Sequence, residues 1–282
     1  MTLPGGGFGE LLSHGGAPIV LPSAHDALSA RLIEQAGFRG LSISGSSLLA
    51  ARYALPDLGL AGLGEMASGV ADILSATRLP TLVDGDDGYG DDMAVRRTIA
   101  TYERLGAAAV TIEDQARAVK RPGQGNAVAL VELHTITAKM RAAVAARADP
   151  DFWIVGRTDA YTVEGIDEAV RRAEAMRDAG ADALFVAGVK DASTLEQVAR
   201  RLTPTPLVAV DYGAIGWSLP SPDALAELGY RLLVHPLVLL PAITAVMSDR
   251  LSQLNDGKRA PMTPGSADAG MALLREATKL AG

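Results

Sequence analysis

The sequence reads Pro80-Thr81-Leu82-Val83-Asp84-Gly85-Asp86-Asp87-Gly88-Tyr89-Gly90, and shortly afterwards Ala108-Ala109-Val110-Thr111-Ile112-Glu113-Asp114-Gln115. In both stretches a short apolar run ends abruptly in carboxylates. Such a run is typical of a buried parallel strand, and polar residues at its carboxyl end predict a site at the mouth of a barrel. Mg²⁺ prefers a few carboxylate oxygens, with room left for water and substrate. The two stretches therefore indicate a metal-dependent enzyme.

The same alternation of an apolar run and an amphipathic run recurs about eight times along the chain. Glycine follows several of the amphipathic runs, as at Gly37, Gly106, Gly180 and Gly229, and glycine commonly ends a helix. This pattern predicts an α/β fold, a (β/α)₈ TIM barrel, with a doubly wound open sheet as the alternative. The expected strands are 18–21, 40–44, 80–84, 108–113, 152–157, 183–186, 206–211 and 231–235. The expected helices between them are 25–35, 63–77, 91–105, 132–146, 166–178, 193–202 and 222–228.

Composition narrows the class of protein. The 282 residues show no linker, so we expect a single barrel domain over 1–282. A net charge of −7 and a pI near 5.2 argue against a nucleic-acid surface. The chain has no cysteine, which excludes disulfides and thiol catalysis in it and favours a cytoplasmic location. The most apolar stretch, 232–247, is interrupted by Pro236 and Pro241 and is shorter than a membrane span, so no membrane partner is expected.

Two segments lie outside the repeating pattern. Residues 116–129 are rich in Gly and Pro and are expected to form a gating loop that contains Lys120. Residues 236–282 exceed what the last barrel helix needs and predict a C-terminal helical extension, with helices at 236–255 and 266–280. The last helix carries an apolar stripe that must be buried on its own barrel or on a neighbouring subunit. The stripe consists of Met271, Leu273, Leu274 and Leu280.

The polar residues that end the strands are the candidates for chemistry. Asp84 and Asp86 alone could belong to a solvated loop, because Asp and Gly are turn formers. Glu113 ends the next strand in the same way, and strands about 5 Å apart should not bring carboxylates together without a cation. We therefore favour a metal site at Asp84, Asp86 and Glu113. Ser44-Gly45-Ser46-Ser47 is either a plain loop or a cradle of N–H and hydroxyl donors for a substrate carboxylate.

Other strand-end residues leave two interpretations open. Arg157 could form a structural ion pair with the carboxylates or could clamp an anionic substrate. His235 could be a buried core histidine or a substrate contact. Asp57, which follows Leu55-Pro56, could simply cap a turn. Tyr212 follows the seventh strand directly, beside Asp211.

Together these stretches resemble the isocitrate lyase/phosphoenolpyruvate mutase superfamily. The resemblance extends over about residues 18–249, and the separation of the Asp-x-Asp and Glu-Asp-Gln motifs is specific. The matching stretches are Ser44-Gly45-Ser46, Leu55-Pro56-Asp57-Leu58-Gly59, Val83 to Gly90, Ile112-Glu113-Asp114-Gln115 and Gly156-Arg157-Thr158-Asp159-Ala160.

The resemblance implies an enzyme that uses Mg²⁺, or Mn²⁺, to hold a small 2-keto acid or its enolate. It implies that Asp84 contacts the metal, while Asp57, Asp86 and Glu113 hold its waters. It also implies that Ser44, Gly45 and Ser46 bind the substrate carboxylate together with Arg157. Members are typically homotetramers in which the last barrel helix packs on a neighbour.

Departures from the family pattern favour one branch. The isocitrate and methylisocitrate lyases carry Lys-Arg-Cys-Gly-His on the loop after the fourth strand, where this chain has Lys120-Arg121-Pro122-Gly123-Gln124. They also have a carboxylate at the end of the sixth strand, where this chain has Ala187. Asn126 matches the phosphonate mutases poorly. Gly188-Val189-Lys190-Asp191 and the stretch from Pro206 to Gly213 are more similar to the oxaloacetate decarboxylase branch, which has a histidine near His235.

The sequence therefore predicts an Mg²⁺-dependent decarboxylase of a small 2-keto dicarboxylate, with oxaloacetate as the first candidate. Its reaction would proceed through a metal-stabilised pyruvate enolate that Tyr212 or His235 orients or protonates. One alternative is a carbon–carbon lyase acting on a methylisocitrate-like or substituted malate-like acid, and another is a phosphonopyruvate or phosphoenolpyruvate mutase. A third is a catalytically silent barrel that binds keto acids.

Overall fold

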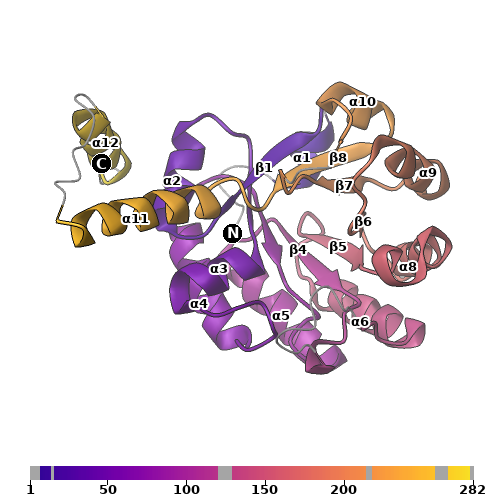
Figure 1. Ribbon diagram of the computed structural model, residues 1–282. Coiled ribbons are helices and arrows are strands. Elements are labelled where there is room, and N and C mark those ends of the chain that lie inside the picture. The colour runs from indigo at the N-terminus through magenta and orange to yellow at the C-terminus, as the bar shows by residue number, and fades with distance from the viewer. Residues whose placement is uncertain (1–6, 14–15, 120–128, 214–217, 258–265, 280–282) are drawn as a thin grey trace.

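The chain folds into a closed barrel of eight parallel strands in sequence order, with helices around it (Figure 1), as seen in a computed structural model that describes residues 7–13, 16–119, 129–213, 218–257 and 266–279. β1 pairs with β8 and closes the ring. The predicted (β/α)₈ barrel is thus confirmed, and the open sheet is excluded. The strands are β1 (Ile19–Ala24), β2 (Leu41–Ile43), β3 (Thr81–Asp84), β4 (Ala109–Glu113), β5 (Trp153–Thr158), β6 (Ala183–Val186), β7 (Leu207–Val210) and β8 (Tyr230–His235).

Helices cover the outside of the barrel, at the residues where the apolar periodicity of the sequence predicts them. Glycines with positive φ follow four of them, at Gly37, Gly106, Gly180 and Gly229. The predicted helices correspond to α2 (Ala27–Gln35), α4 (Leu63–Ser75), α5 (Asp92–Leu105), α6 (Leu133–Ala146), α8 (Ile166–Asp178), α9 (Ala192–Leu202), α10 (Pro222–Glu227), α11 (Leu240–Asn255) and α12 (Ser266–Ala277). The structure adds α1 (Phe8–Ser13), α3 (Gly45–Tyr53), α7 (Tyr161–Glu164) and a short 3₁₀ helix, η1 (Arg117–Val119).

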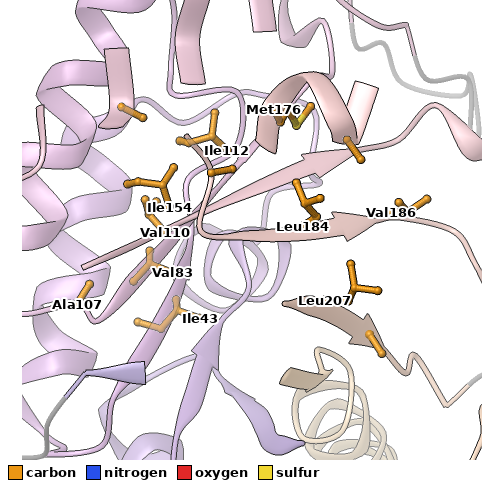
Figure 2. Close-up of a cluster of buried hydrophobic side chains, with 14 of the residues drawn as sticks. Ile43, Val83, Ala107, Val110, Ile112, Ile154, Met176, Leu184, Val186 and Leu207 are labelled. Carbon is orange, nitrogen blue, oxygen red and sulfur yellow. The ribbon is translucent and has the colours of Figure 1, made fainter. Parts of the chain in front are cut away.

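Two separate apolar clusters pack on the two faces of the sheet. The outer cluster lies between strands and helices, and Figure 2 shows Ile43, Val83, Val110 and Ile154 from successive strands within it. The inner cluster fills the barrel, and Phe8 of α1 belongs to it although Phe8 precedes the first strand. Successive residues of a strand point to opposite faces, so every strand except β2, whose inward residue is Ser42, contributes to both clusters. This alternation also decides which polar residues can reach the barrel mouth.

The C-terminal extension departs from the barrel. α11 leaves β8 and runs outward past α2, and α12 lies at its far end (Figure 1). None of the side chains of α11 is buried. In α12, Met271, Leu273 and Leu274 are exposed, whereas Ala277 is buried and the helix contacts α2. Leu280, the last residue of the expected stripe, lies outside the described residues.

Within the part of the chain that the structure describes, no helix combines the length and apolar character that a membrane crossing requires.

Candidate active site

A cavity of about 130 Å³ opens at the carboxyl ends of the strands, which is where the active sites of these barrels lie. Its lining is mainly polar on the side of β1 to β5, where Ile43 and Leu82 also lie, and mainly apolar on the side of β6 to β8, where Tyr212 is the polar residue. Phe185, Val208, Val210 and Val234, from β6, β7 and β8, form the apolar wall. The polar residues that line it are Ser23, Ser42, Ser44, Ser46, Asp57, Asp84, Thr111, Arg157 and Tyr212.

The inward face of each strand supplies the polar residues. Asp84 follows the inward Leu82 by two positions on β3, and Arg157 follows the inward Val155 by two positions on β5. Tyr212 follows the inward Val210 in the same way after β7. The carboxyl ends of adjacent strands therefore bring these side chains to one cavity although they are far apart in sequence.

Asp84 lies against the first turn of α3. The backbone N–H of Gly45 donates to Oδ2 of Asp84 at 3.2 Å, and the N–H of Asp86 donates to Oδ1 of Asp84 at 3.2 Å. A Cβ added at Gly45 would lie 3.2 Å from Oδ2 of Asp84 and 3.4 Å from Oδ1 of Asp86. The lack of a side chain at Gly45 therefore allows the close approach of helix and carboxylates.

The stretch 44–47 is the start of a helix and not a loop. Ser44 is the N-cap of α3, and Gly45 and Ser46 begin its first turn. The hydroxyls of Ser44 and Ser46 lie 3.0 Å apart, and both residues line the cavity. A helix N-terminus presents free N–H groups and a positive dipole end, both of which favour an anion. Of the predicted carboxylate cradle, Ser44 and Ser46 line the cavity, whereas the N–H of Gly45 donates to Asp84.

Arg157 forms ion pairs with two carboxylates, those of Glu113 and Asp159, beside the cavity. Its Nη1 lies 3.0 Å from Oε2 of Glu113, its direct neighbour across the β4–β5 pair. Its Nε and Nη2 each donate to Asp159 at 2.9 Å. Its guanidinium also lies over the ring of Phe185 at 5.4 Å and lines the cavity. Arg157 thus forms the structural ion pairs and faces the cavity as well, so its two interpretations are compatible.

The electrostatics of the site are those of a buried carboxylate group. Burial raises the pKa of Glu113 well above its usual range, Arg157 lowers it, and Asp159, Asp84 and Asp86 raise it further. Burial alone would lower the pKa of Arg157, but Asp159 and Glu113 raise it well above its ordinary value. Buried carboxylates repel one another, and a cation bound among them would reduce this repulsion. Burial also raises the pKa of Tyr212, which keeps its phenol protonated at neutral pH.

The donors fit a hard cation held mainly through water. Among the described residues, no three His, Cys, Asp or Glu side chains converge on one point as a ligand cage. Asp86 is paired with Arg117 at 3.2 Å and Glu113 with Arg157 at 3.0 Å, so each of these two carboxylates already has a cationic partner. Mg²⁺ commonly retains several waters and binds one or two carboxylates. Asp84 would hold such an ion, with Asp57 nearby on the cavity lining.

One of the predicted site residues lies elsewhere. His235 does not line the cavity: Val234 and Pro236 do, so the intervening His235 points out of the barrel into an apolar groove. There its Nδ1 lies 3.7 Å from Oδ2 of Asp211. Strand alternation accounts for this orientation, because Val234 points into the barrel and its neighbour His235 must point outward. Lys120 and most of the expected gating loop 116–129 lie outside the described residues.

Sequence reasoning missed several residues that brace the site. Asp114, which directly follows β4, is fully buried and accepts hydrogen bonds from the hydroxyl of Thr158 and the N–H of Asp159. Lys139 on α6 binds Asp87 with Nζ at 3.1 Å from Oδ2. Asp159 could have been found from its position two residues after Arg157, on the same side of the chain. The sequence carries no such signal for Lys139, which lies 52 residues from its partner.

Comparisons with known proteins agree with this geometry. A family model described as phosphoenolpyruvate phosphomutase matches residues 8–255. A probable 2-methylisocitrate lyase of Corynebacterium glutamicum is 38% identical over 237 residues, covering 84% of this chain and 77% of that protein. An oxaloacetate decarboxylase of Bradyrhizobium diazoefficiens is 36% identical over 258 residues, covering 90% of this chain and 87% of that protein.

Solved structures superpose over nearly the whole chain. Oxaloacetate acetylhydrolase in complex with the product oxalate matches with a TM-score of 0.85 at 28% identity, covering 95% of this chain and 91% of that chain. Phosphonopyruvate hydrolase complexed with oxalate and Mg²⁺ matches with a TM-score of 0.74 at 28% identity, covering 92% of each chain.

Proposed function

We propose that this chain, which belongs to the phosphoenolpyruvate mutase/isocitrate lyase superfamily and is a carbon–carbon lyase, decarboxylates a small 2-keto dicarboxylate of the oxaloacetate type. The observation that carries the proposal is the division of the cavity into a polar side and an apolar wall. The similarity to an oxaloacetate decarboxylase over 90% of the chain supports it.

The polar side suits one carboxylate and the adjacent keto group of the substrate. Ser44, Ser46 and the first turn of α3 offer hydroxyl and N–H donors, and Arg157 offers a guanidinium. Ion pairs with Glu113 and Asp159 fix the orientation of this guanidinium. When bound at Asp84, Mg²⁺ or Mn²⁺ would supply positive charge where the keto oxygen becomes an enolate oxygen.

The apolar wall suits the part of the substrate that leaves. Phe185, Val210 and Val234 offer no partner to a carboxylate, and Ala187 beyond them is buried. A carboxylate placed there loses hydration, whereas the CO₂ that it becomes is neutral and needs none. The bond between C3 and the distal carboxylate breaks, its electron pair forms the enolate, and C3 then takes a proton. Tyr212 is protonated and lines the cavity, so we propose its phenol as the proton donor.

The small cavity argues against a tricarboxylate substrate. A volume of about 130 Å³ matches a four-carbon acid better than a branched tricarboxylate. The chain also contains no thiol that could move a proton. The alternative, cleavage of a methylisocitrate-like or substituted malate-like acid, is favoured by the 38% identity to a probable 2-methylisocitrate lyase.

Product analysis separates the two reactions. The purified protein is incubated with oxaloacetate, 2-methylisocitrate or 2,3-dimethylmalate in the presence of Mg²⁺ or Mn²⁺, and a protein-free metal blank is subtracted. The proposal predicts CO₂ and pyruvate in equal amounts from oxaloacetate, with turnover lost on addition of EDTA. Intact oxaloacetate, together with two larger fragments from one of the other acids, would establish the alternative.

We also propose that the protein is a homo-oligomer, a tetramer by resemblance to its family. α11 exposes a stripe of large apolar side chains, including Val246 at 60% and Leu251 at 64% exposure. An apolar groove of about 370 Å³ lies between α2 and the start of the C-terminal extension, lined by Leu28, Leu32 and Phe38 among others. A reciprocal exchange of α11 between copies would cover both surfaces.

A further inference from the structure

A single guanidinium joins three segments beside the candidate site. Arg117, on η1, donates from Nη1 to Oδ2 of Asp86 at 3.2 Å and from Nε to the carbonyl of Gly59 at 3.2 Å. Its Nη2 donates to the carbonyl of Ala61. Its Cζ also lies 4.8 Å from the centre of the Tyr89 ring. These partners come from the 59–61 segment and from the acidic loop after β3.

The surroundings of Arg117 are shaped to receive it. Its side chain is only 16% exposed. Gly59 has φ of +69°, and a Cβ added there would lie 2.6 Å from Cγ and 2.9 Å from Nε of Arg117. Tyr89, whose ring faces the guanidinium, has φ of +62°, an unusual conformation for a residue with a side chain. Hydrogen bonds from a charged donor are stronger than neutral ones when they are shielded from water.

The backbone that carries Arg117 is itself anchored. The N–H of Ala116 donates to the carbonyl of Ala129 at 2.7 Å, and Gln115 and Leu130 form an isolated antiparallel bridge. The N–H of Arg117 donates to the carbonyl of Gln115 at 3.1 Å. Because these contacts fix the backbone of Arg117, its guanidinium can hold other segments in place.

Both segments that Arg117 contacts, 59–61 and the acidic loop after β3, lie close to residues of the cavity. Asp57, two residues before Gly59, lines the cavity together with Asp84. Asp86 has one oxygen, Oδ2, toward Arg117, and its other oxygen, Oδ1, lies 3.4 Å from the Cβ position of Gly45. The orientation of Asp86 and the position of the segment after Asp57 are therefore set by the same guanidinium.

We propose that Arg117 is a positioning residue for the cation site: it fixes the 57–61 segment and directs Oδ1 of Asp86 toward the Gly45 side of the site. The inference rests on the proposed function to the extent that a divalent cation binds at Asp84. Arg117 touches neither substrate nor cation in this arrangement and acts through Asp57 and Asp86.

The test compares Arg117→Met and Arg117→Lys with the control Arg52→Met, which removes a surface arginine paired with Asp72. Mn²⁺ binding in the presence of oxalate is measured by electron paramagnetic resonance, and amide exchange of residues 57–61 by mass spectrometry. Arg117→Met should raise the Mn²⁺ dissociation constant about tenfold and speed exchange in 57–61 alone, because several charged hydrogen bonds are lost. Arg117→Lys should give a smaller effect, because an ammonium can pair with Asp86 but cannot also reach both carbonyls.

Gly59→Ala provides a second route to the same result. It leaves Arg117 in the chain but places a methyl group in the path of its side chain, at a backbone φ of +69° that is also strained for alanine, so the Mn²⁺ affinity is the decisive readout for this variant. The proposal predicts weaker Mn²⁺ binding and faster exchange in 57–61 for this variant as well.

Unchanged Mn²⁺ affinity and unchanged exchange in folded Arg117→Met or Gly59→Ala would overturn the proposal. Faster exchange throughout the barrel would also overturn it, since Arg117 would then be a general structural residue. Neither measurement uses oxaloacetate, so a protein that binds Mn²⁺ but does not decarboxylate oxaloacetate would refute the proposed function and leave this inference standing. A wild-type protein that does not bind Mn²⁺ with oxalate would refute both.

Discussion

At the scale of single residues, the site depends on a close approach between the backbone of α3 and a carboxylate. Gly45 donates its N–H to Asp84, and no side chain stands between them. Gly45 lies in the first turn of α3, and a helical position normally favours alanine over glycine, because glycine loses more conformational entropy on folding. Glycine at this position is therefore explained by the site and not by the helix.

Gly45→Ala tests this explanation. The added methyl group would contact Oδ2 of Asp84 and Oδ1 of Asp86, so we expect kcat/KM for the metal-dependent reaction to fall by about tenfold or more, or about 1.4 kcal/mol in transition-state stabilisation. Thermal stability should stay the same or rise slightly. Steady-state kinetics with Mg²⁺ and thermal unfolding provide the two measurements.

Gly64→Ala is the matched control, because Gly64 lies in the first turn of α4 with nothing within 4 Å of the added Cβ. It should gain about 0.5–1 kcal/mol of stability and keep full activity. Equal activity of the Gly45→Ala and Gly64→Ala variants would show that the close approach has no catalytic consequence.

How far single residues could be predicted depended on strand alternation. Asp84, Arg157 and Tyr212 line one cavity, as their positions at the strand ends of a parallel barrel predict, while their roles there stay a prediction. The expectation for His235 ignored the alternation that its neighbour Val234 defines. The role of Arg117 could not be predicted, because its partners lie 31 to 58 residues away and no local pattern marks them.

At the scale of secondary-structure elements, the eight strands and most helices follow from apolar periodicity and from glycine at helix ends. α3 was missed because the stretch 44–47 consists of Ser and Gly, which are typical of loops, and because its weakly amphipathic sequence hides the helical period. α1 was missed because its apolar contact, Phe8, lies in a glycine-rich N-terminal segment. Both helices therefore form because of tertiary packing and not because of a local sequence signal.

The N-cap of α9 offers a prediction at this scale. Asp191 accepts hydrogen bonds from the hydroxyl of Ser193 at 2.7 Å and the N–H of Thr194 at 3.0 Å, and these contacts lower its pKa. Because the folded state favours the ionised carboxylate, its contribution is present above the ordinary Asp pKa and is lost as pH falls through the lowered one. Asp191→Ala should therefore cost about 1 kcal/mol at neutral pH, and the difference should shrink in acid.

Denaturant unfolding of both proteins between neutral and acidic pH measures this difference. Asp191→Asn serves as the control, since its side-chain oxygen can still accept the N–H of Thr194 but does not titrate. A destabilisation by Asp191→Ala that stays constant across the pH range would argue against an ionised cap.

At the scale of the whole molecule, the barrel is well packed, whereas the extension from α11 to α12 leaves apolar surface in solvent. Five large apolar side chains along α11 are 41–64% exposed, which is uncommon over a contiguous surface of a monomer. The sequence predicted this extension but left open whether it packs on its own barrel. In the structure α11 runs away from it (Figure 1).

Charge on the exposed face of α11 should therefore dissociate the proposed oligomer. We expect the double variant Val246→Glu/Leu251→Glu to show a smaller mass in light scattering coupled to size-exclusion chromatography, with its circular dichroism preserved. Ser252→Glu is the control, because at 100° per residue Ser252 lies on the opposite face of the helix. A monomeric wild-type protein, or a double variant of unchanged mass, would contradict the proposed exchange of α11.

The proposed chemistry depends on a divalent cation that binds at the barrel mouth through Asp84. Isothermal titration of the wild-type protein and of Asp84→Asn with Mg²⁺ in the presence of oxalate measures this binding. We predict saturable binding to the wild type and an affinity at least about a hundredfold weaker in Asp84→Asn, equivalent to about 2.7 kcal/mol, with the variant still folded. Equal Mg²⁺ affinities for the two proteins would contradict the claim.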